Sequence, residues 1–172
     1  MDWLGNYLYR WRIRTVLPHV SGALLDLACG TNELIKAYGS GVGADRYPSG
    51  EVDVAIEDAA RLPFDDNTFD TVTILAALNH IPNRAEALGE VYRVLKPNGT
   101  LVVTMIPPWT SRIWHRVRGE ADRDQAERDW APGEVYGLTR SSTRQLLMNA
   151  GFRDVRQHGF MFGINTLTLS VK

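Results

Sequence analysis

Two carboxylates and a turn between them form the clearest candidate site in the sequence. Asp26 lies in the apolar run 23–28, and a turn containing Gly30 follows directly. Asp45 comes at the end of a second short apolar run. In open α/β sheets, a nucleotide-like ligand binds in the crevice at the carboxyl ends of the strands, where free backbone N–H groups of the turn point. An acid at Asp45 can accept hydrogen bonds from both hydroxyls of a ribose, so the pattern predicts an adenosine-type ligand.

The turn differs from that of dinucleotide-binding folds. The pattern Gly-x-Gly-x-x-Gly is absent, because the strand leads into residues 28–32, Ala-Cys-Gly-Thr-Asn. No helix start is cleared by glycine for a pyrophosphate. A nicotinamide-dependent oxidoreductase is therefore the weakest of the functional hypotheses.

Alternating strand and helix patterns must position these residues. Apolar runs predict strands over residues 23–28, 41–45, 52–56, 69–75 and 100–106, and helical spacing predicts helices over 3–20, 31–38, 83–95 and 140–150. Residues 155–162 and 165–171 alternate and predict a terminal antiparallel pair joined around Gly163, while residues 96–99 are expected to form a turn. The alternation indicates βαβ units and a mostly parallel sheet.

Turn and cap signals refine the helix ends. Thr31 is expected to cap the helix over 31–38, and Ser141 or Ser142 the helix over 140–150. Residues 109–118 are expected to be helical. Residues 119–129 are highly charged and predict a solvated helix or a loop.

The composition indicates an ordinary globular chain. Its 172 residues are 44% hydrophobic and 23% charged, enough for one core without disulfides. The single cysteine, Cys29, excludes an intrachain disulfide and a cysteine-based zinc cluster, and the four histidines are widely separated. The formal net charge of −1 lacks the basic excess of many nucleic-acid binders. We expect one cytoplasmic domain over residues 1–172, without a signal sequence, a membrane span, a metal or a nucleic-acid partner.

Several segments, in order, resemble the class I S-adenosylmethionine-dependent methyltransferases, especially their ubiquinone-methylase-like group (methyltransferase type 11). The matching segments are residues 25–31, 42–45, 57–64, 66–72, 79–81 and 90–101. Each alone is a weak signal, but their order and spacing together are specific. The resemblance implies an α/β, Rossmann-like doubly wound fold, with a mostly parallel seven-stranded sheet and an antiparallel C-terminal strand.

The resemblance also implies S-adenosyl-L-methionine as cofactor and S-adenosyl-L-homocysteine as product. Asp26 would orient the methionine amine, Asp45 the ribose, and Asp58 with Ala59 the adenine. The implied cofactor-binding set is Asp26, Ala28, Cys29, Gly30, Asp45, Arg46, Asp58, Ala59, Leu75 and Ala76. Helix capping or turn formation is the structural alternative for the three acids, and Cys29 is expected to pack as a small residue.

The implied chemistry is direct displacement at the sulfonium methyl, with the acceptor atom held in line in a water-poor cleft. His80, just after the fourth strand, is the candidate catalytic residue. It could act as a general base near neutral pH, or it could order the loop by hydrogen bonding, as could Asn79. Both interpretations stay open.

Two positions depart from the family pattern. Ala28 and Asn32 stand where the family has glycines. Ala28 is tolerable if its φ is negative, and Asn accepts unusual turns. These departures favour one alternative function, a non-catalytic or partner-dependent methyltransferase-like domain. An arginine-rich first helix leaves open a second, a nucleic-acid or protein methylase.

The acceptor must be recognised by the remaining segments. The family places acceptor-binding elements after the fifth strand, so residues 107–137 are expected to form an insertion or lid. Its apolar and cationic side chains are Trp109, Arg112, Trp114, Arg116, Trp130 and Tyr136. The helix over 3–20 is expected to dock on the sheet, with a membrane-surface or substrate-capping role as the alternative. A small-molecule acceptor, with an open cleft or one completed in a homodimer, fits this chain.

Overall fold

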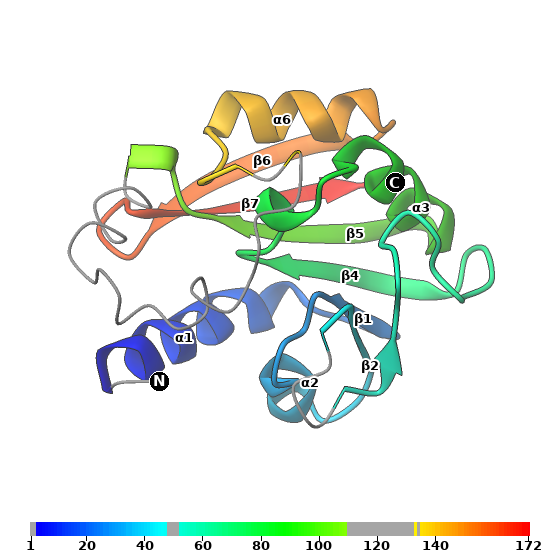
Figure 1. Cartoon of the computed structure of the whole chain (residues 1–172), viewed down its shortest axis with the longest axis horizontal. Coiled ribbons are helices and arrows are strands. Elements are labelled where there is room, and N and C mark those ends of the chain that lie inside the picture. The colour runs from blue at the N-terminus through cyan, green and yellow to red at the C-terminus, as the bar shows by residue number, and fades with distance from the viewer. Residues whose placement is uncertain (1–2, 48–51, 110–132, 134) are drawn as a thin grey trace.

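A seven-stranded sheet organises the computed structural model, which describes residues 3–47, 52–109, 133 and 135–172 (Figure 1). The strands are β1 Leu24–Leu27, β2 Val42–Asp45, β3 Val54–Ala55, β4 Phe69–Leu75, β5 Leu95–Met105, β6 Arg153–Phe160 and β7 Asn165–Val171. Their order is β3-β2-β1-β4-β5-β7-β6. Neighbours from β3 to β5 are parallel, and β7 is antiparallel to both β5 and β6. The predicted doubly wound sheet is confirmed.

Helices cover both faces of the sheet. The helical elements are α1 Trp3–Val16, η1 Leu17–His19, α2 Glu33–Tyr38, η2 Leu78–His80, α3 Arg84–Val94 and α6 Arg140–Asn149. Buried residues of α1 and α2 belong to one core cluster and those of α3 and α6 to the other; in Figure 1, α6 lies at the top, α3 at the right, and α1 and α2 at the bottom. No helix in the described ranges is long and apolar enough to cross a bilayer.

Alternation along the strands divides the core into two clusters. On β5, Val102 points to the cluster of α1 and α2, whereas Leu101 and Val103 point to the cluster of α3 and α6. All three are fully buried. Because both faces are covered, the strands read as continuous apolar runs.

The fifth strand begins earlier than predicted. Leu95 already pairs with Phe69, and the register then shifts before Thr71 pairs with Thr100. Residues 96–99, expected as a turn, therefore lie within β5, and Asn98 takes a φ of +64° there. Residues 96–99 thus coincide with an irregularity in the β4–β5 ladder and not with a turn before the strand.

Both predicted helix caps are wrong by one to three residues. Asn32, not Thr31, precedes α2, and it has a left-handed φ of +62°. Thr139, not Ser141 or Ser142, caps α6, since its side chain accepts a hydrogen bond from the Ser142 N–H. Only Thr139 caps with its side chain, since the Asn32 side chain makes no cap hydrogen bond to α2. The other ends differ by a few residues, and β3 is only two residues long. Apart from Trp109, the predicted segments 109–118 and 119–129 lie outside the described residues.

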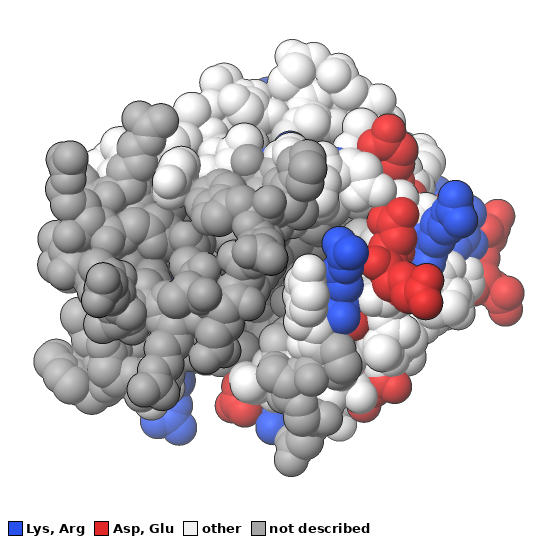
Figure 2. Space-filling model, in the orientation of Figure 1, with Lys and Arg blue, Asp and Glu red and all other residues white. Residues whose placement is uncertain are grey.

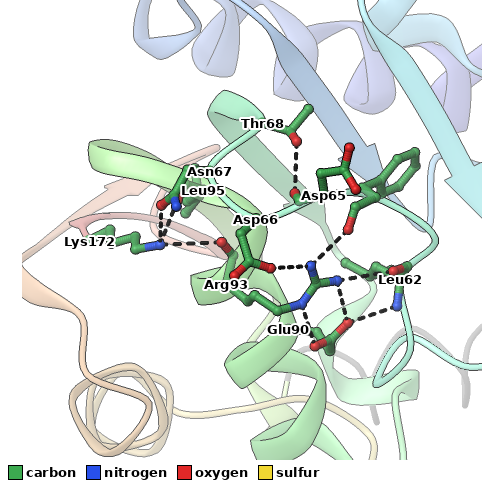
Figure 3. A network of polar contacts seen from close by, with 10 residues as sticks. Leu62, Asp65, Asp66, Asn67, Thr68, Glu90, Arg93, Leu95 and Lys172 are labelled. Atoms are coloured by element: carbon green, nitrogen blue, oxygen red, sulfur yellow. Dashed lines mark hydrogen bonds and ion pairs between the residues drawn. The ribbon is translucent and has the colours of Figure 1, made fainter.

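Arg93 fastens the segment after β3 to α3 (Figure 3). Its guanidinium donates to the carbonyls of Leu62 and Phe64, at 3.1 and 2.8 Å, and to Asp66 at 2.7 Å. It also donates to both carboxylate oxygens of Glu90, which in turn accepts from the Leu62 N–H. These charge-assisted bonds lower the pKa of Glu90. The family-like run at 90–101 is therefore a structural clamp here.

The clamp predicts a large stability effect for one exchange. In Arg93→Met, two carbonyls and two carboxylates lose a donor, so we expect the free energy of unfolding to fall by about 3 kcal/mol. Urea denaturation measures it. The control is Lys96→Met, which removes a single half-exposed pair with Asp70 and should cost less than about 1 kcal/mol. Equal losses in the two variants would contradict the clamp.

Candidate functional site

The turn between β1 and α2 has an unusual backbone. Ala28, Gly30 and Asn32 have φ angles of +61°, +59° and +62°. The N–H groups of Ala28 and Cys29 both donate to the carbonyl of Ala44, at 2.7 and 3.3 Å. The condition under which alanine would be tolerable at residue 28, a negative φ, is not met: the residue is left-handed, which costs a non-glycine residue about 1–2 kcal/mol. The expectation that Asn32 accepts an unusual turn is confirmed.

Asp45 holds this turn against β2. One carboxylate oxygen accepts from the Gly30 N–H and the other from the Tyr47 N–H, at 2.8 and 2.9 Å. Asp45 is half-buried. The carboxylate is therefore fixed beside the glycine of the turn, at the carboxyl ends of two adjacent parallel strands.

Asn32 is accommodated by Asp53, which lies just before β3, and by Gly43 of β2. Its side-chain amide donates to Asp53 Oδ2 at 2.8 Å, and the Gly43 N–H donates to the same oxygen at 2.8 Å. A Cβ at residue 43 would overlap the Asn32 side chain. A glycine on β2 thus makes room for the side chain that replaces a glycine in the turn.

Asp26 is a buried acid directly below the turn. It is 2% exposed, and the Thr73 hydroxyl on β4 donates to its Oδ1 at 2.5 Å. Burial raises the pKa of Asp26 from 3.8 to about 7; the Thr73 bond opposes this shift, and the charge of Asp45 adds to it. The side chain can therefore take up or release a proton near neutral pH.

Tyr9 of α1 reaches the same turn, which the sequence analysis did not anticipate. Its hydroxyl is hydrogen-bonded to the Thr31 side chain, and Asp26 lies near enough to act on it electrostatically. Burial, followed by the charge of Asp26, raises the pKa of Tyr9 to about 12. Its helical spacing with Ile13 and Val16, both buried, was the available signal. The first helix docks on the sheet and also borders the candidate site.

The carboxyl end of β4 supplies the opposite wall. Leu75 and Ala76 are half-buried, and Ala76 has a φ of +54°. The Ala76 N–H donates to both the carbonyl and the hydroxyl of Thr104, at 2.9 and 3.1 Å. Ala76 is thus fixed by β5, with its backbone turned at the strand end.

His80 ends the short helix η2 that follows β4 and is half-buried. The preceding Asn79 exchanges two hydrogen bonds with Val135: its amide donates to the Val135 carbonyl at 3.0 Å, and its carbonyl accepts from the Val135 N–H at 3.1 Å. Asn79 therefore ties the loop, as its structural interpretation predicted. The role of His80 stays a prediction.

Asp58 lies in the segment after β3. Its Oδ1 accepts from the Ala60 N–H and from the Asn83 side chain, both at 2.9 Å. These bonds lower the pKa of Asp58. Asp58 therefore forms a turn, as its structural alternative predicted. Ala59 beside it is half-buried, and exposed Arg46 lies over the Tyr47 ring at 5.6 Å.

The described ends of segment 107–137 lie side by side. A Cβ at residue 137 would overlap the carbonyl of Ile106, and Arg84 donates to the Gly133 carbonyl at 2.6 Å. The excursion thus leaves and rejoins the fold at the carboxyl end of β5, beside η2. Trp109 and Tyr136 are exposed. Arg112, Trp114, Arg116 and Trp130 lie outside the described residues.

Neither the cysteine nor the charge distribution points to other chemistry. Cys29 is buried, and burial together with the nearby Asp26 and Asp45 raises its thiol pKa to about 12. In the described residues no cluster of three histidine, cysteine or acidic side chains could hold a metal. Figure 2 shows basic and acidic side chains of the described residues interspersed toward the right of this face, rather than a single basic field.

Comparisons with known proteins agree with this geometry. Residues 25–103 match the family described as "Methyltransferase domain". The chain is 40% identical over 102 residues to a ubiquinone/menaquinone biosynthesis C-methyltransferase of Hydrogenovibrio crunogenus, a match that covers 46% of this chain and 40% of that protein. It is 30% identical over 189 residues to one from Neisseria meningitidis serogroup A, covering 87% of this chain and 74% of that protein. The chain thus spans less than half of the first relative.

The fold also has solved counterparts. A SAM-dependent methyltransferase from Archaeoglobus fulgidus superposes with a TM-score of 0.73 at 18% identity, over 99% of this chain and 100% of that one. At this identity the likeness concerns the fold alone.

The left-handed angle of Ala28 predicts a stabilising exchange. Ala28→Gly removes the strain of a Cβ at positive φ, so we expect the free energy of unfolding to rise by about 1 kcal/mol. Ala37→Gly on the exposed face of α2 is the control, and it should lower the same quantity by up to about 1 kcal/mol. Urea denaturation of both variants measures whether each exchange raises or lowers the free energy of unfolding. A destabilised Ala28→Gly variant would show that the alanine methyl is needed for packing.

The raised pKa of Asp26 predicts a pH-dependent stability. The folded state holds this proton up to about pH 7, whereas the unfolded chain releases it near pH 4. Stability therefore falls as the pH rises from 4 to 7 and then levels. Asp26→Asn removes this component. Between pH 4 and 7, the free energy of unfolding of the variant should rise relative to that of the wild type, by on the order of 2–4 kcal/mol in total. Urea denaturation at pH 4.5, 6 and 7.5 measures the difference, with exposed Asp65→Asn as control. Parallel curves for wild type and Asp26→Asn would contradict the assignment.

Proposed function

The chain belongs to the class I S-adenosylmethionine-dependent methyltransferases, in their ubiquinone-methylase-like group, and on this premise we propose that it transfers a methyl group from S-adenosyl-L-methionine to a small-molecule acceptor. The observation that carries the proposal is the Asp45 carboxylate, fixed at the β1–α2 turn above buried Asp26. The family resemblance deduced from the sequence is confirmed.

The residues at the turn fit an adenosine-containing cofactor. Asp45 is already oriented by two backbone N–H groups, so it presents a fixed acceptor for the two ribose hydroxyls. A Cβ at Gly30 would meet open space, which leaves room for a ligand beside the turn. The backbone of Ala28, Cys29 and Gly30 would line the same side.

The remaining cofactor contacts follow from the neighbouring strands. Asp58 and Ala59 would hold the adenine, with Arg46 at the ribose side, and Leu75 and Ala76 would line the methionine portion. Asp26 would face the methionine amine, directly or through water. A cation there favours the ionised form of Asp26, since opposite charges lower the pKa of a buried acid.

S-adenosylmethionine carries the reactive methyl on a sulfonium, so the displacement chemistry arrives with the cofactor. What the chain must add is alignment and exclusion of water. Ala76 is locked by Thr104 at the strand end, which gives the methionine side a rigid wall. His80 would take a proton from an acceptor, or order the loop through which the acceptor enters.

A quinone-type ring is the first acceptor to test. Its support is that the relatives include a ubiquinone/menaquinone biosynthesis C-methyltransferase and a demethylmenaquinone methyltransferase. Segment 107–137, which departs from and rejoins the fold beside His80, would supply the acceptor side. The reaction is proposed for the cytoplasm, with no metal or nucleic acid, and with a homodimer as one way to complete the cleft.

Calorimetric titration with S-adenosyl-L-homocysteine tests the cofactor site. Asp45→Ala removes a charged acceptor for two hydroxyls, so we expect affinity to drop at least about 30-fold. Exposed Asp65→Ala is the control and should bind as the wild type does. Thermal unfolding separates lost binding from lost folding, because Asp45 also holds the turn. Unchanged affinity in a folded Asp45→Ala variant would refute the assignment.

The reaction itself is tested with S-adenosylmethionine labelled in its methyl group, incubated with a demethylated quinone ring and, separately, with a cell metabolite extract. Label in the quinone supports the full proposal. Label only in another small molecule keeps the methyl transfer and replaces the acceptor. Binding of the cofactor without transfer to any acceptor would favour the partner-dependent alternative.

A further inference from the structure

One nitrogen of an arginine in α1 is buried and has no hydrogen-bond acceptor among the described residues. The Nε of Arg12 is buried and, across the described part of the chain, has no hydrogen-bond acceptor. None of the ion pairs between described residues includes Arg12. Burial opposes its charge and lowers its pKa. A buried charge without a partner is destabilising unless an anion reaches it.

The position of Arg12 places it at the cofactor turn. It follows Tyr9 by three residues, so the two side chains share one face of α1. The two groups also interact electrostatically. Tyr9 in turn is hydrogen-bonded to Thr31 and close to Asp26. Arg12 therefore lies next to the phenol that borders the carboxyl end of β1.

The other two arginines of α1 face elsewhere. Arg10 and Arg14 are exposed, and they line a surface hollow with Tyr7, Trp11 and Thr15. Solvent can satisfy both of these cations. Only Arg12 is turned inward, which makes the two exposed arginines matched controls for it.

The charges around the turn are complementary to an amino acid zwitterion. Asp26 and Arg12 both lie near enough to Tyr9 to act on it electrostatically, and they carry opposite charges: Asp26 attracts a cation and Arg12 attracts an anion. A guanidinium fork suits a carboxylate, which it can bind through two parallel hydrogen bonds. We infer that Arg12 binds the α-carboxylate at the methionine end of the cofactor while Asp26 faces its amine. This inference rests on the proposed function and adds the residue that recognises the amino acid portion.

Two ligands that differ only in that portion test the inference. S-adenosyl-L-homocysteine carries the amino acid end, and 5′-methylthioadenosine lacks it. In Arg12→Met we expect affinity for the first to fall about 30-fold, as for the loss of a charge-assisted pair, and affinity for the second to change less than about threefold. Arg10→Met and Arg14→Met should leave both affinities within about threefold. Calorimetric titration measures the affinity of the wild type and of the three variants for each of the two ligands.

The stability of the ligand-free protein gives a second readout. Because the exchange removes an unpaired buried charge and keeps an apolar stem, Arg12→Met should unfold at the same or a higher temperature. Arg12→Lys keeps the charge without the fork, and it should bind S-adenosyl-L-homocysteine between wild type and Arg12→Met.

Each outcome separates the inference from the proposed function. If the wild type binds neither ligand, both fail. If the wild type binds both and Arg12→Met loses them equally, or loses neither, the cofactor site stands and the role of Arg12 is overturned. A lower unfolding temperature with equal losses would assign Arg12 to the packing of α1.

Discussion

The left-handed turn between β1 and α2 is the constraint on which the rest of the site depends. Three of its five residues have positive φ, and only one of them is glycine. The cost is offset by neighbouring segments. In β2, the Ala44 carbonyl accepts from Ala28 and Cys29 and the Asp45 carboxylate accepts from Gly30, and Asp53, just before β3, accepts from Asn32. Turn and strand are therefore specified together. The same carboxylate that holds Gly30 is the one a ribose would meet, so the shape of the turn and the recognition of the ligand depend on one residue.

Buried charges, unlike the hydrogen bonds of the turn, lower the stability of the ligand-free protein. Asp26 and Arg12 both lie inside the protein, and the burial shifts their pKa values toward the neutral forms. Neither residue is needed to fill space, since apolar side chains pack better in such positions. Their retention is understandable if a ligand with both charges binds between them. Stability given up in the free protein then returns on binding, and any ligand selective for the folded state raises apparent stability by mass action.

How far the sequence predicts this structure depends on the range of the interactions. β4 and β7 lie where the apolar patterns predicted them, because burial on both faces or alternation is a property of the strand itself. The cap of α6 is Thr139 instead of Ser141 or Ser142, because neighbouring hydroxyl residues offer equivalent cap chemistry, whereas α2 starts after Asn32 without a side-chain cap bond. The positive φ of Ala28 could not be predicted from its residue type, because alanine disfavours such an angle. The angle is imposed by the hydrogen bonds of the turn to β2.

The candidate site also contains both residues that local sequence predicts and residues that only tertiary contacts position. The acids at the ends of β1 and β2 were predictable, since strand ends in a parallel sheet converge on one edge. Tyr9 and Arg12 were not, because their place follows from how α1 packs across the sheet, a contact between segments far apart in sequence. The short 3–10 helix at His80 and its tie to Val135 likewise arise from tertiary contacts.

The proposed cofactor and acceptor sides therefore differ in how they are held in place. The residues proposed to bind the cofactor lie at strand ends whose positions are fixed by the ladder and by Thr73 and Thr104, both fully buried. The proposed acceptor side is segment 107–137, whose described ends lie together at Ile106 and Gly137. Connecting segments outside a sheet tolerate changes in length and sequence better than its strands do. One cofactor site can thus serve relatives with different acceptors, because acceptor choice is separable from the fold that holds the methyl donor.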